Sequence, residues 1–139
     1  MDANRRVIEQ FRAGGEIEGM HRDRLLLLTT TGRKSGNPYT TPMMFHRLDP
    51  DRVIVIASDI GAPTHPDWYL NLAANPTVTV EVGTEKYQAR AIPTAGPERT
   101  HLWTMLKSHY PFFADHEAKT DRTIPVVVLE RAESYSPGT

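Results

Sequence analysis

The sequence predicts a mainly β domain, a small closed or split antiparallel barrel of about six strands with helices at its edges. Apolar or alternating segments of strand length follow one another through short turns, as in antiparallel sheets. These segments do not alternate with long helices, which disfavours a doubly wound parallel sheet. The chain has 139 residues. We expect one barrel domain over residues 21–139, preceded by an amphipathic helix and linker over residues 1–20.

The first half of the chain supplies one helix and three strands in this prediction. Residues 2–13 carry apolar side chains at helical spacing, and Gly14 and Gly15 end the helix. Three segments are expected to be strands: LLLLTTT at 25–31, the stretch 39–47 after the GRKSGNP hairpin, and RVIVIAS at 52–58. The third segment is almost wholly apolar, which indicates burial on both faces.

The second half supplies two helices and three strands. Thr64 is a candidate helix cap and Asp67 favours a helix N-terminus, so a short helix is expected over 68–75. A longer helix is expected over 97–110, starting at a proline, and residues 111–123 are expected to be irregular. Strands are expected over 77–82, 86–93 and 124–131.

Composition and missing motifs exclude several classes of function. The absence of cysteine excludes disulfides, thiolate catalysis and cysteine-ligated metals, and it fits a reducing, cytoplasmic compartment. A net charge of −1 provides no field that would recruit nucleic acid. No Walker loop, nucleophile elbow or zincin motif occurs. The six histidines form no closely spaced ligand pair, so no metal site is expected.

Three short segments carry side chains suited to a ligand site. GRKSG (32–36) places Arg33 and Lys34 at a hairpin tip, which is either a solvated turn or an anion-binding turn. SDIG (58–61) follows the most buried predicted strand, where loops often contact ligands. DWYLN (67–71) places two aromatic residues and an asparagine on a short helix. Taken singly, each segment is at least as common in plain turns, connections or core packing.

In combination, four motifs resemble the deazaflavin-dependent nitroreductase family. They are GRKSG-x-P, V-I-V-x-A-S, P-x-WYLNL-x-ANP and TDRTIP, in order and with compatible spacing from Leu25 to Glu130. The family consists of split β-barrel oxidoreductases that use coenzyme F420. This cofactor joins a deazaflavin ring to a phosphodiester and a polyglutamate tail, so it is a long polyanion with one flat end. The resemblance therefore implies that the GRKS turn binds an anion.

The resemblance also implies which residues contact the cofactor. The phosphate and tail would be bound by Arg33, Lys34 and Ser35. The following strand would lie along the cofactor with Tyr39, Thr40, Thr41, Pro42, Met43 and Met44. The ring would face Ile56, Ala57, Ser58 and Asp59. The short helix would close the site with Asp67, Trp68, Tyr69, Leu70 and Asn71, and Phe113 completes the predicted set.

The implied reaction is hydride transfer from the reduced cofactor to a quinone, enone or nitroaromatic acceptor. Such an acceptor needs a proton or hydrogen-bond donor at its developing negative charge. Tyr110 matches a tyrosine of the family and is the predicted donor, with Ser58 orienting the acceptor or the ring. Phe113 and His116 stand where the family has further tyrosines, so reduction of the same nitro compounds is not implied.

Several alternatives remain open from the sequence. FMN-dependent reductases share the split-barrel architecture, and Phe113 and His116 in place of the family's tyrosines leave a non-catalytic F420 carrier open. A nucleic-acid-binding barrel is disfavoured. Arg5, Arg6 and Arg12 beside apolar residues suit either packing over the substrate pocket or peripheral contact with the inner face of the cell membrane. Asp121 and Arg122 of TDRTIP are expected to form a structural ion pair. The oligomeric state is not indicated.

Overall fold

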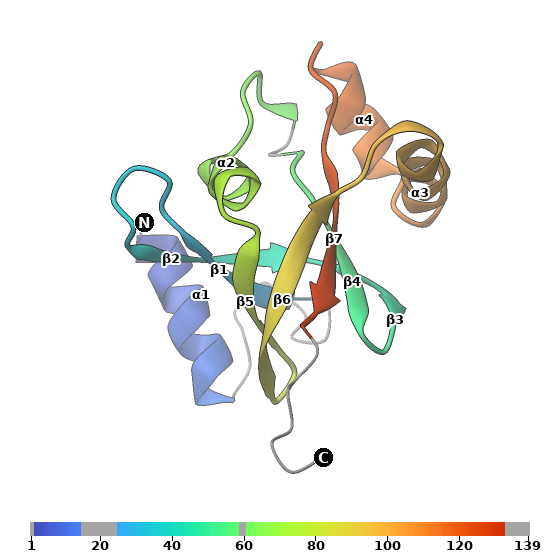
Figure 1. Cartoon of the computed structure of the whole chain (residues 1–139). Helices are drawn as coiled ribbons and strands as arrows, with labels where there is room; N and C mark the ends of the chain where they lie inside the picture. The colour runs from blue at the N-terminus through green and yellow to red at the C-terminus, as the bar shows by residue number, and fades with distance from the viewer. Residues whose placement is uncertain (1, 15–24, 59–60, 133–139) are drawn as a thin grey trace.

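Seven strands form one curled antiparallel sheet (Figure 1). The computed structural model describes residues 2–14, 25–58 and 61–132. Its strands are β1 (Leu25–Thr31), β2 (Pro38–Met44), β3 (His46–Asp49), β4 (Arg52–Ile56), β5 (Thr77–Val82), β6 (Glu85–Pro93) and β7 (Val126–Arg131). Their order in the sheet is β2-β1-β5-β6-β7-β4-β3. This curled half-barrel confirms the predicted fold class, with seven strands where about six were expected.

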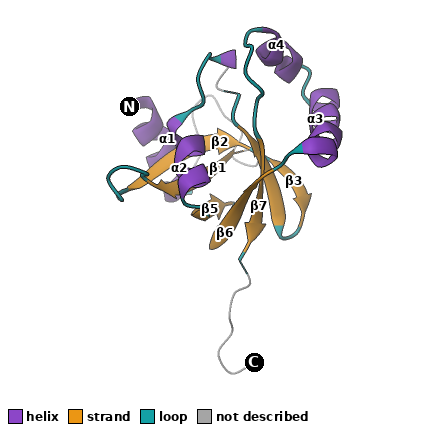
Figure 2. Cartoon of the chain, turned by 45° about the horizontal axis from the view of Figure 1, so that its top comes forward, coloured by secondary structure: helices purple, strands orange, loops and turns teal. Residues whose placement is uncertain are grey.

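Helices lie around the edges of the sheet. Within the described residues they are α1 (Asp2–Ala13), α2 (Asp67–Ala74), α3 (Gly96–His109) and α4 (Phe112–Ala118). Helix α1 lies beside β1 and β2, whereas α3 and α4 lie together on the opposite side of the molecule (Figure 2). Helix α2 packs on β1 and β6. Among the described helices, none combines the length and apolar character needed to cross a bilayer.

The predicted strand over 39–47 is in fact two strands separated at Phe45. The first, β2, pairs with β1 at one edge of the sheet, and the second, β3, pairs with β4 at the other edge. Two consecutive strands therefore form the two edges, which is geometrically possible only because the sheet curls until its edges approach each other. No residue in the stretch marks this change of partner, so the sequence pattern suggested one strand.

The segment predicted to be irregular, 111–123, contains helix α4. The helix starts directly after Pro111 and buries Phe113, while Glu117 accepts a hydrogen bond of 2.6 Å from the Trp103 indole N–H on α3. Its seven residues are too few to show a helical period in the sequence. The cap prediction for α2 is also wrong, because Pro66 rather than Thr64 holds the N-cap position.

Strand β4 has hydrophobic packing on both faces, as predicted from its apolar sequence. Val53 and Val55 belong to the core cluster that includes Leu72 of α2. Ile54 points to the other face, into the cluster with Leu106 of α3. All three strand residues are fully buried. The strand thus connects the α2 side of the barrel to the α3 side.

Strand β1 is likewise covered on both faces. Leu26 and Leu28 point into the main core, and Leu25 and Leu27 contact Phe11 of α1 on the outer face. Phe11 is only 4% exposed, so α1 is packed firmly against the barrel. This contact places the polar face of α1 next to the β1–β2 turn, where it can form the wall of a site.

Replacing Gly61 by alanine is expected to lower the free energy of unfolding more than the same change at Gly83. Both glycines have a positive φ, 76° and 59°, where other residues lose about 1–2 kcal/mol. A Cβ at Gly61 would lie 2.6 Å from the backbone oxygen of His116, whereas one at Gly83 meets nothing within 4 Å. In urea denaturation, the loss of unfolding free energy at Gly61 should exceed the loss at Gly83 by more than about 1 kcal/mol. Equal losses in the two variants would show that α4 is not fixed against the chain at Gly61.

Candidate functional site

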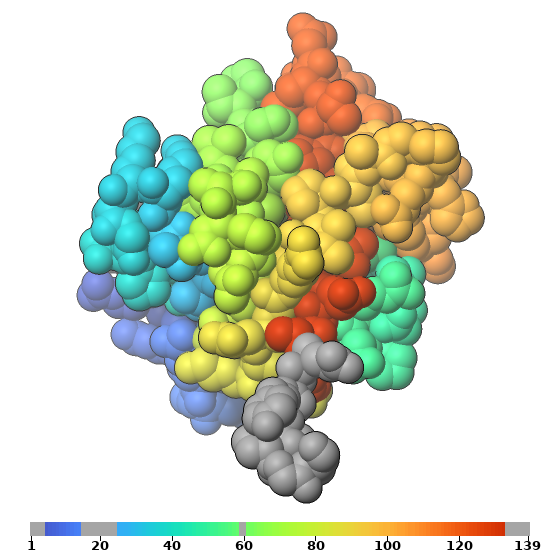
Figure 3. Space-filling view, in the orientation of Figure 1, coloured from blue at the N-terminus to red at the C-terminus, as the bar shows by residue number. Residues whose placement is uncertain are grey.

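A groove of about 860 Å³ lies between α1, the β1–β2 turn and α2. These three segments are neighbours on one surface of the molecule in Figure 3, coloured blue, cyan and yellow-green. The lining residues are Arg5, Ile8, Glu9 and Arg12 of α1, then Thr30, Gly32, Arg33, Lys34, Ser35, Pro38, Tyr39, Thr40 and Thr41, and finally Asp67, Trp68 and Asn71 of α2. Its volume is in the range of small-molecule and cofactor sites.

The groove gathers part of the predicted cofactor set. Arg33, Lys34, Ser35, Tyr39, Thr40, Thr41, Asp67, Trp68 and Asn71 line it. Pro42, Met43, Met44, Ile56, Ala57, Ser58, Tyr69, Leu70 and Phe113 are not among its lining residues, and Asp59 lies outside the described residues. The α1 residues of the lining were not in the predicted cofactor set, because the resemblance starts only at Leu25.

Asn71 of α2 holds the turn between β1 and β2 in place. Its side chain is buried, and its Oδ1 accepts hydrogen bonds from the backbone N–H of Arg33 at 3.2 Å and from Arg33 Nη1 at 2.8 Å. Its Nδ2 donates to Thr30 Oγ1 at 3.3 Å. The amide is therefore occupied mainly by the protein itself. Asn71 positions Arg33, and its direct contact with a cofactor stays a prediction.

The remaining contacts of the turn differ in strength. Arg33 Nη2 lies 3.2 Å from Asp67 Oδ1, but Asp67 is 86% exposed and such a pair contributes little. The Tyr39 ring covers Gly32, and its hydroxyl lies 3.1 Å from Ser35 Oγ. Lys34 is exposed and forms no hydrogen bond or ion pair with any residue that the structure describes. Lys34 is thus the cation of the turn that is available to a ligand.

A second polar cluster lies at the loop after β4. Ser58 is buried, and its hydroxyl lies 3.1 Å from His116 Nδ1 on α4. The rings of Phe112 and Phe113 pack on His116, with centroids 5.5 and 5.7 Å away. The structure therefore brings the predicted residues Ser58 and Phe113 together around His116, away from the lining of the groove. What this cluster does chemically stays a prediction.

The predicted catalytic residue Tyr110 joins this cluster only at its edge. Its ring contacts Phe113 at a centroid distance of 6.0 Å, and its hydroxyl lies 2.9 Å from His46 Nδ1 on β3. Burial and the neighbouring His109 lower the pKa of His46 below its ordinary value. A neutral imidazole can exchange a proton with the phenol across this hydrogen bond.

Arg122 holds the loop between β4 and α2. It donates to the backbone oxygens of Ala57 at 2.9 Å, Ser58 at 2.7 Å and Ala62 at 2.8 Å. Its Nη1 also lies 3.0 Å from His65 Nδ1. The ion pair expected between Arg122 and its sequence neighbour is not found among the described residues. The Arg122 guanidinium instead binds backbone oxygens of residues that lie about 60 positions earlier in the chain.

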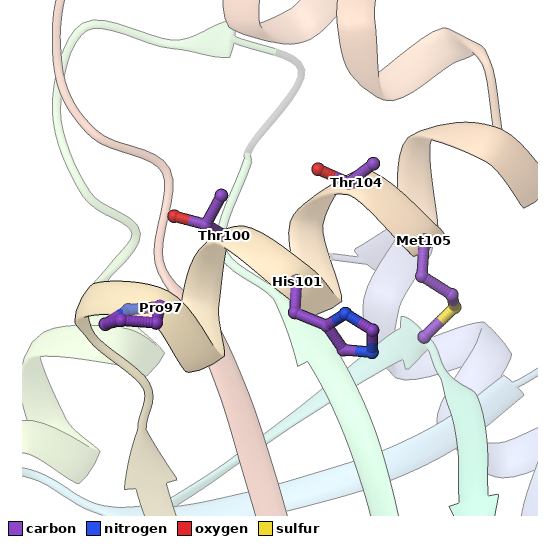
Figure 4. Close-up of a pocket in the computed structure, with 5 residues that line it drawn as sticks. All are labelled: Pro97, Thr100, His101, Thr104 and Met105. Atoms are coloured by element: carbon purple, nitrogen blue, oxygen red, sulfur yellow. The ribbon is translucent and has the colours of Figure 1, made fainter.

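Another depression, of about 570 Å³, runs along α3 (Figure 4). It is lined by Pro97, Thr100, His101, Thr104 and Met105, all from this one helix. No second element converges on it and it carries no carboxylate, Lys or Arg. Groups of three or more His, Cys, Asp or Glu that could bind a metal are also missing from the described part of the chain. The groove beside α1 is therefore the stronger candidate for a ligand with several charges.

Comparison with known proteins settles the family. The profile described as F420H(2)-dependent quinone reductase matches residues 3–131. The chain belongs to this family. It is therefore an oxidoreductase, and its cofactor is coenzyme F420 rather than FMN. This result confirms the resemblance seen in GRKSG, WYLNLAANP and TDRTIP.

Curated relatives and solved structures agree with this membership. An F420H(2)-dependent quinone reductase of Mycobacterium tuberculosis strain H37Rv is 38% identical over 109 residues, covering 76% of this chain and 72% of the relative. A solved F420-H2 dependent reductase, FDR-A, has a TM-score of 0.69 at 39% identity and covers 81% of this chain and 100% of its own. A structure described as a domain-swapped dimer has a TM-score of 0.72 at 37% identity, covering 91% and 96%.

Replacing Arg122 by lysine is expected to lower the free energy of unfolding by about 2–4 kcal/mol. Lysine keeps the positive charge, but its ammonium group cannot reach three separate carbonyls in the planar arrangement that the guanidinium satisfies. Urea denaturation measures the loss. Arg90→Lys is the matched control, because the Arg90 side chain is exposed and forms no hydrogen bond or ion pair with described residues. A loss of the same size in both variants would contradict a bracing role for Arg122.

Acidification is expected to destabilise the protein through His65. Burial and the charge of Arg122 lower the pKa of His65 from its ordinary value of 6.5. The unfolded chain therefore takes up a proton near pH 6.5 while the folded His65 stays neutral, so this stability is present above pH 6.5 and is lost below it. Urea denaturation at about pH 7.5 and pH 5.5 measures the free energy of unfolding, and its loss between the two pH values should be smaller for His65→Gln than for the wild type.

The control for this pH dependence is His101→Gln, at an exposed position of α3. This variant is expected to keep the full wild-type change between the two pH values. His46, whose pKa burial also lowers, contributes with the same sign, so some pH dependence should survive in His65→Gln. An unchanged pH dependence in His65→Gln would mean that the His65–Arg122 contact does not bias the proton equilibrium.

Proposed function

We propose that this oxidoreductase reduces a quinone with electrons from F420, and that the groove beside α1 binds the anionic end of the cofactor. The observation that carries the proposal is the position of the GRKS turn on the wall of this groove. Relatives at 38% identity are described as F420H(2)-dependent quinone reductases, which supports a quinone as the acceptor. Enones and nitroaromatic compounds remain further acceptors to be screened.

The residues of the groove fit the chemistry of F420. A phosphodiester and a glutamate tail require cations and hydrogen-bond donors, and the groove offers Lys34 and the hydroxyl of Ser35. The flat end of the cofactor requires apolar surface, and Ile8 and Trp68 line the same groove. Because Asn71 already holds Arg33, one side of the site is organised before a ligand arrives.

Bound F420 supplies the hydride; the protein positions the reactants and controls protons. Tyr110 is the proposed donor to the acceptor oxygen. A proton that leaves its hydroxyl can be replaced from solvent through His46, which lies 2.9 Å away and takes up a proton at Nε2 as it gives one up at Nδ1. Ser58 Oγ is the proposed orienting group, and its hydrogen bond to His116 fixes its direction. Arg122 holds the backbone of Ser58 in place. Tyr110 and His46 form one hydrogen-bonded pair. Ser58, on the loop after β4, joins His116 and Arg122 in a second group.

A fluorescence titration with oxidised F420 tests the binding site. Lys34→Ala is expected to weaken binding about two- to fivefold at low salt, because an exposed cation contributes up to about 1 kcal/mol. The difference should shrink at high salt, where the charges are screened. Lys34 is a cleaner probe than Arg33, because loss of the Arg33 side chain would also remove one hydrogen bond from buried Asn71. Lys86→Ala, on the exposed side of β6, is the matched control.

Titration with FMN and a turnover assay complete the test. The wild type is expected to bind F420 in preference to FMN and to oxidise reduced F420 when a quinone such as menadione is added. Failure to bind F420, or a preference for FMN, would overturn the proposal. Binding of F420 without oxidation by any quinone, enone or nitroaromatic compound would leave a carrier rather than a reductase.

A further inference from the structure

The cations that line the groove are not equally available to a ligand. Arg12 donates two hydrogen bonds to Glu81, from Nε at 3.1 Å and from Nη2 at 2.8 Å. Arg33 is held by Asn71 and Asp67. These two guanidinium groups already have partners within the protein, so much of their hydrogen-bonding capacity is used before a ligand binds.

Two other cations of the groove have no partner among the described residues. Arg5 of α1 and Lys34 of the β1–β2 turn are both exposed, and neither side chain forms a hydrogen bond or ion pair there. They belong to different walls of the same groove. An anion between the two walls would meet one free positive charge from each side.

The wall that carries Arg5 is fixed to the barrel. Phe11 is buried against Leu25 and Leu27, and Arg12 is joined to Glu81 of β5 through a two-point contact. Arg5 precedes Arg12 by seven positions in the helix, which places Arg5 roughly 10 Å further along the axis of α1. The position of Arg5 is therefore set by the same contacts that dock the helix.

Glu9 adds a negative charge to this wall. It is exposed, lines the groove and lies one helical turn from Arg5 at i, i+4 spacing. Within the described part of the chain it forms no ion pair of 4 Å or less. An acidic ligand that binds Arg5 would consequently be repelled by Glu9, so the two side chains should act on its affinity with opposite signs.

We infer that Arg5 binds the glutamate carboxylates of the F420 tail from the side of α1, opposite Lys34, and that Glu9 opposes this binding. The inference rests on the proposed function, because it assigns the tail to the same groove. A tail of repeated carboxylates suits exposed cations better than a buried site would, since each carboxylate keeps part of its hydration. Helix α1 would then take part in cofactor binding as well as in packing.

The test compares two ligands and four proteins at low salt. The ligands are F420 with its glutamates and the tail-less form, which keeps the deazaflavin ring and the phosphodiester. Arg5→Ala should weaken binding of tailed F420 about two- to fivefold and leave the tail-less form unchanged. Glu9→Gln should strengthen binding of tailed F420 by a similar factor. Arg90→Ala, an exposed substitution on β6 outside the groove, should leave the binding of both ligands unchanged.

The outcomes separate this inference from the proposed function. If the wild type binds both ligands equally, the tail contributes nothing, and the inference is wrong while F420 binding stands. If Arg5→Ala weakens both ligands equally, Arg5 acts on the ring or phosphate region or on the fold, and the tail assignment is also wrong. If Glu9→Gln weakens the binding of tailed F420, Glu9 does not repel the tail, and that part of the inference is wrong. If the wild type binds neither ligand, the proposed function fails together with the inference.

Discussion

The geometry of the groove depends on the buried side-chain amide of Asn71. From α2 it joins Thr30 of β1 to the backbone and the guanidinium of Arg33. A buried amide left without partners would cost about 1–3 kcal/mol, so helix, strand and turn are held together as one unit. The cost of ordering Arg33 is thereby met during folding, whereas the Lys34 side chain stays exposed and without a partner among the described residues.

A second arrangement of the same kind organises the other end of the molecule. The guanidinium of Arg122 holds carbonyls of Ala57, Ser58 and Ala62, so the described part of the loop after β4 is fixed at three points. The two arrangements are connected because β2 and β3 are consecutive strands at the two edges of a curled sheet. Curling therefore brings the GRKS turn, which precedes the edge strand β2, and the loop with Ser58, which follows β4 next to the other edge, onto one barrel.

Sequence reasoning succeeded where a local pattern determines the structure. β1 and β4 were recognised because their apolar runs are buried on both faces, and the GRKS turn was found because its motif is local. The division at Phe45 was missed because it depends on which strand each half pairs with, information that no short segment contains. Arg122 was misinterpreted for the same reason: its partners are distant carbonyls, not the adjacent Asp121. The groove wall on α1 lay outside the resemblance, so its charges suited either packing over the substrate pocket or contact with a membrane, and no cofactor-binding residue was predicted there.

The docking of α1 bears on the two interpretations of this helix that the sequence allowed. Phe11 is buried on β1, and Val7 and Ile8 pack against the same cluster, so the apolar face is already in use. Glu81, only 9% exposed, receives its compensating charge from Arg12. Insertion of this face into a membrane would uncover the outer face of β1 and leave a largely buried carboxylate unpaired, which is strongly unfavourable. Packing over the groove is therefore the arrangement that the rest of the barrel supports.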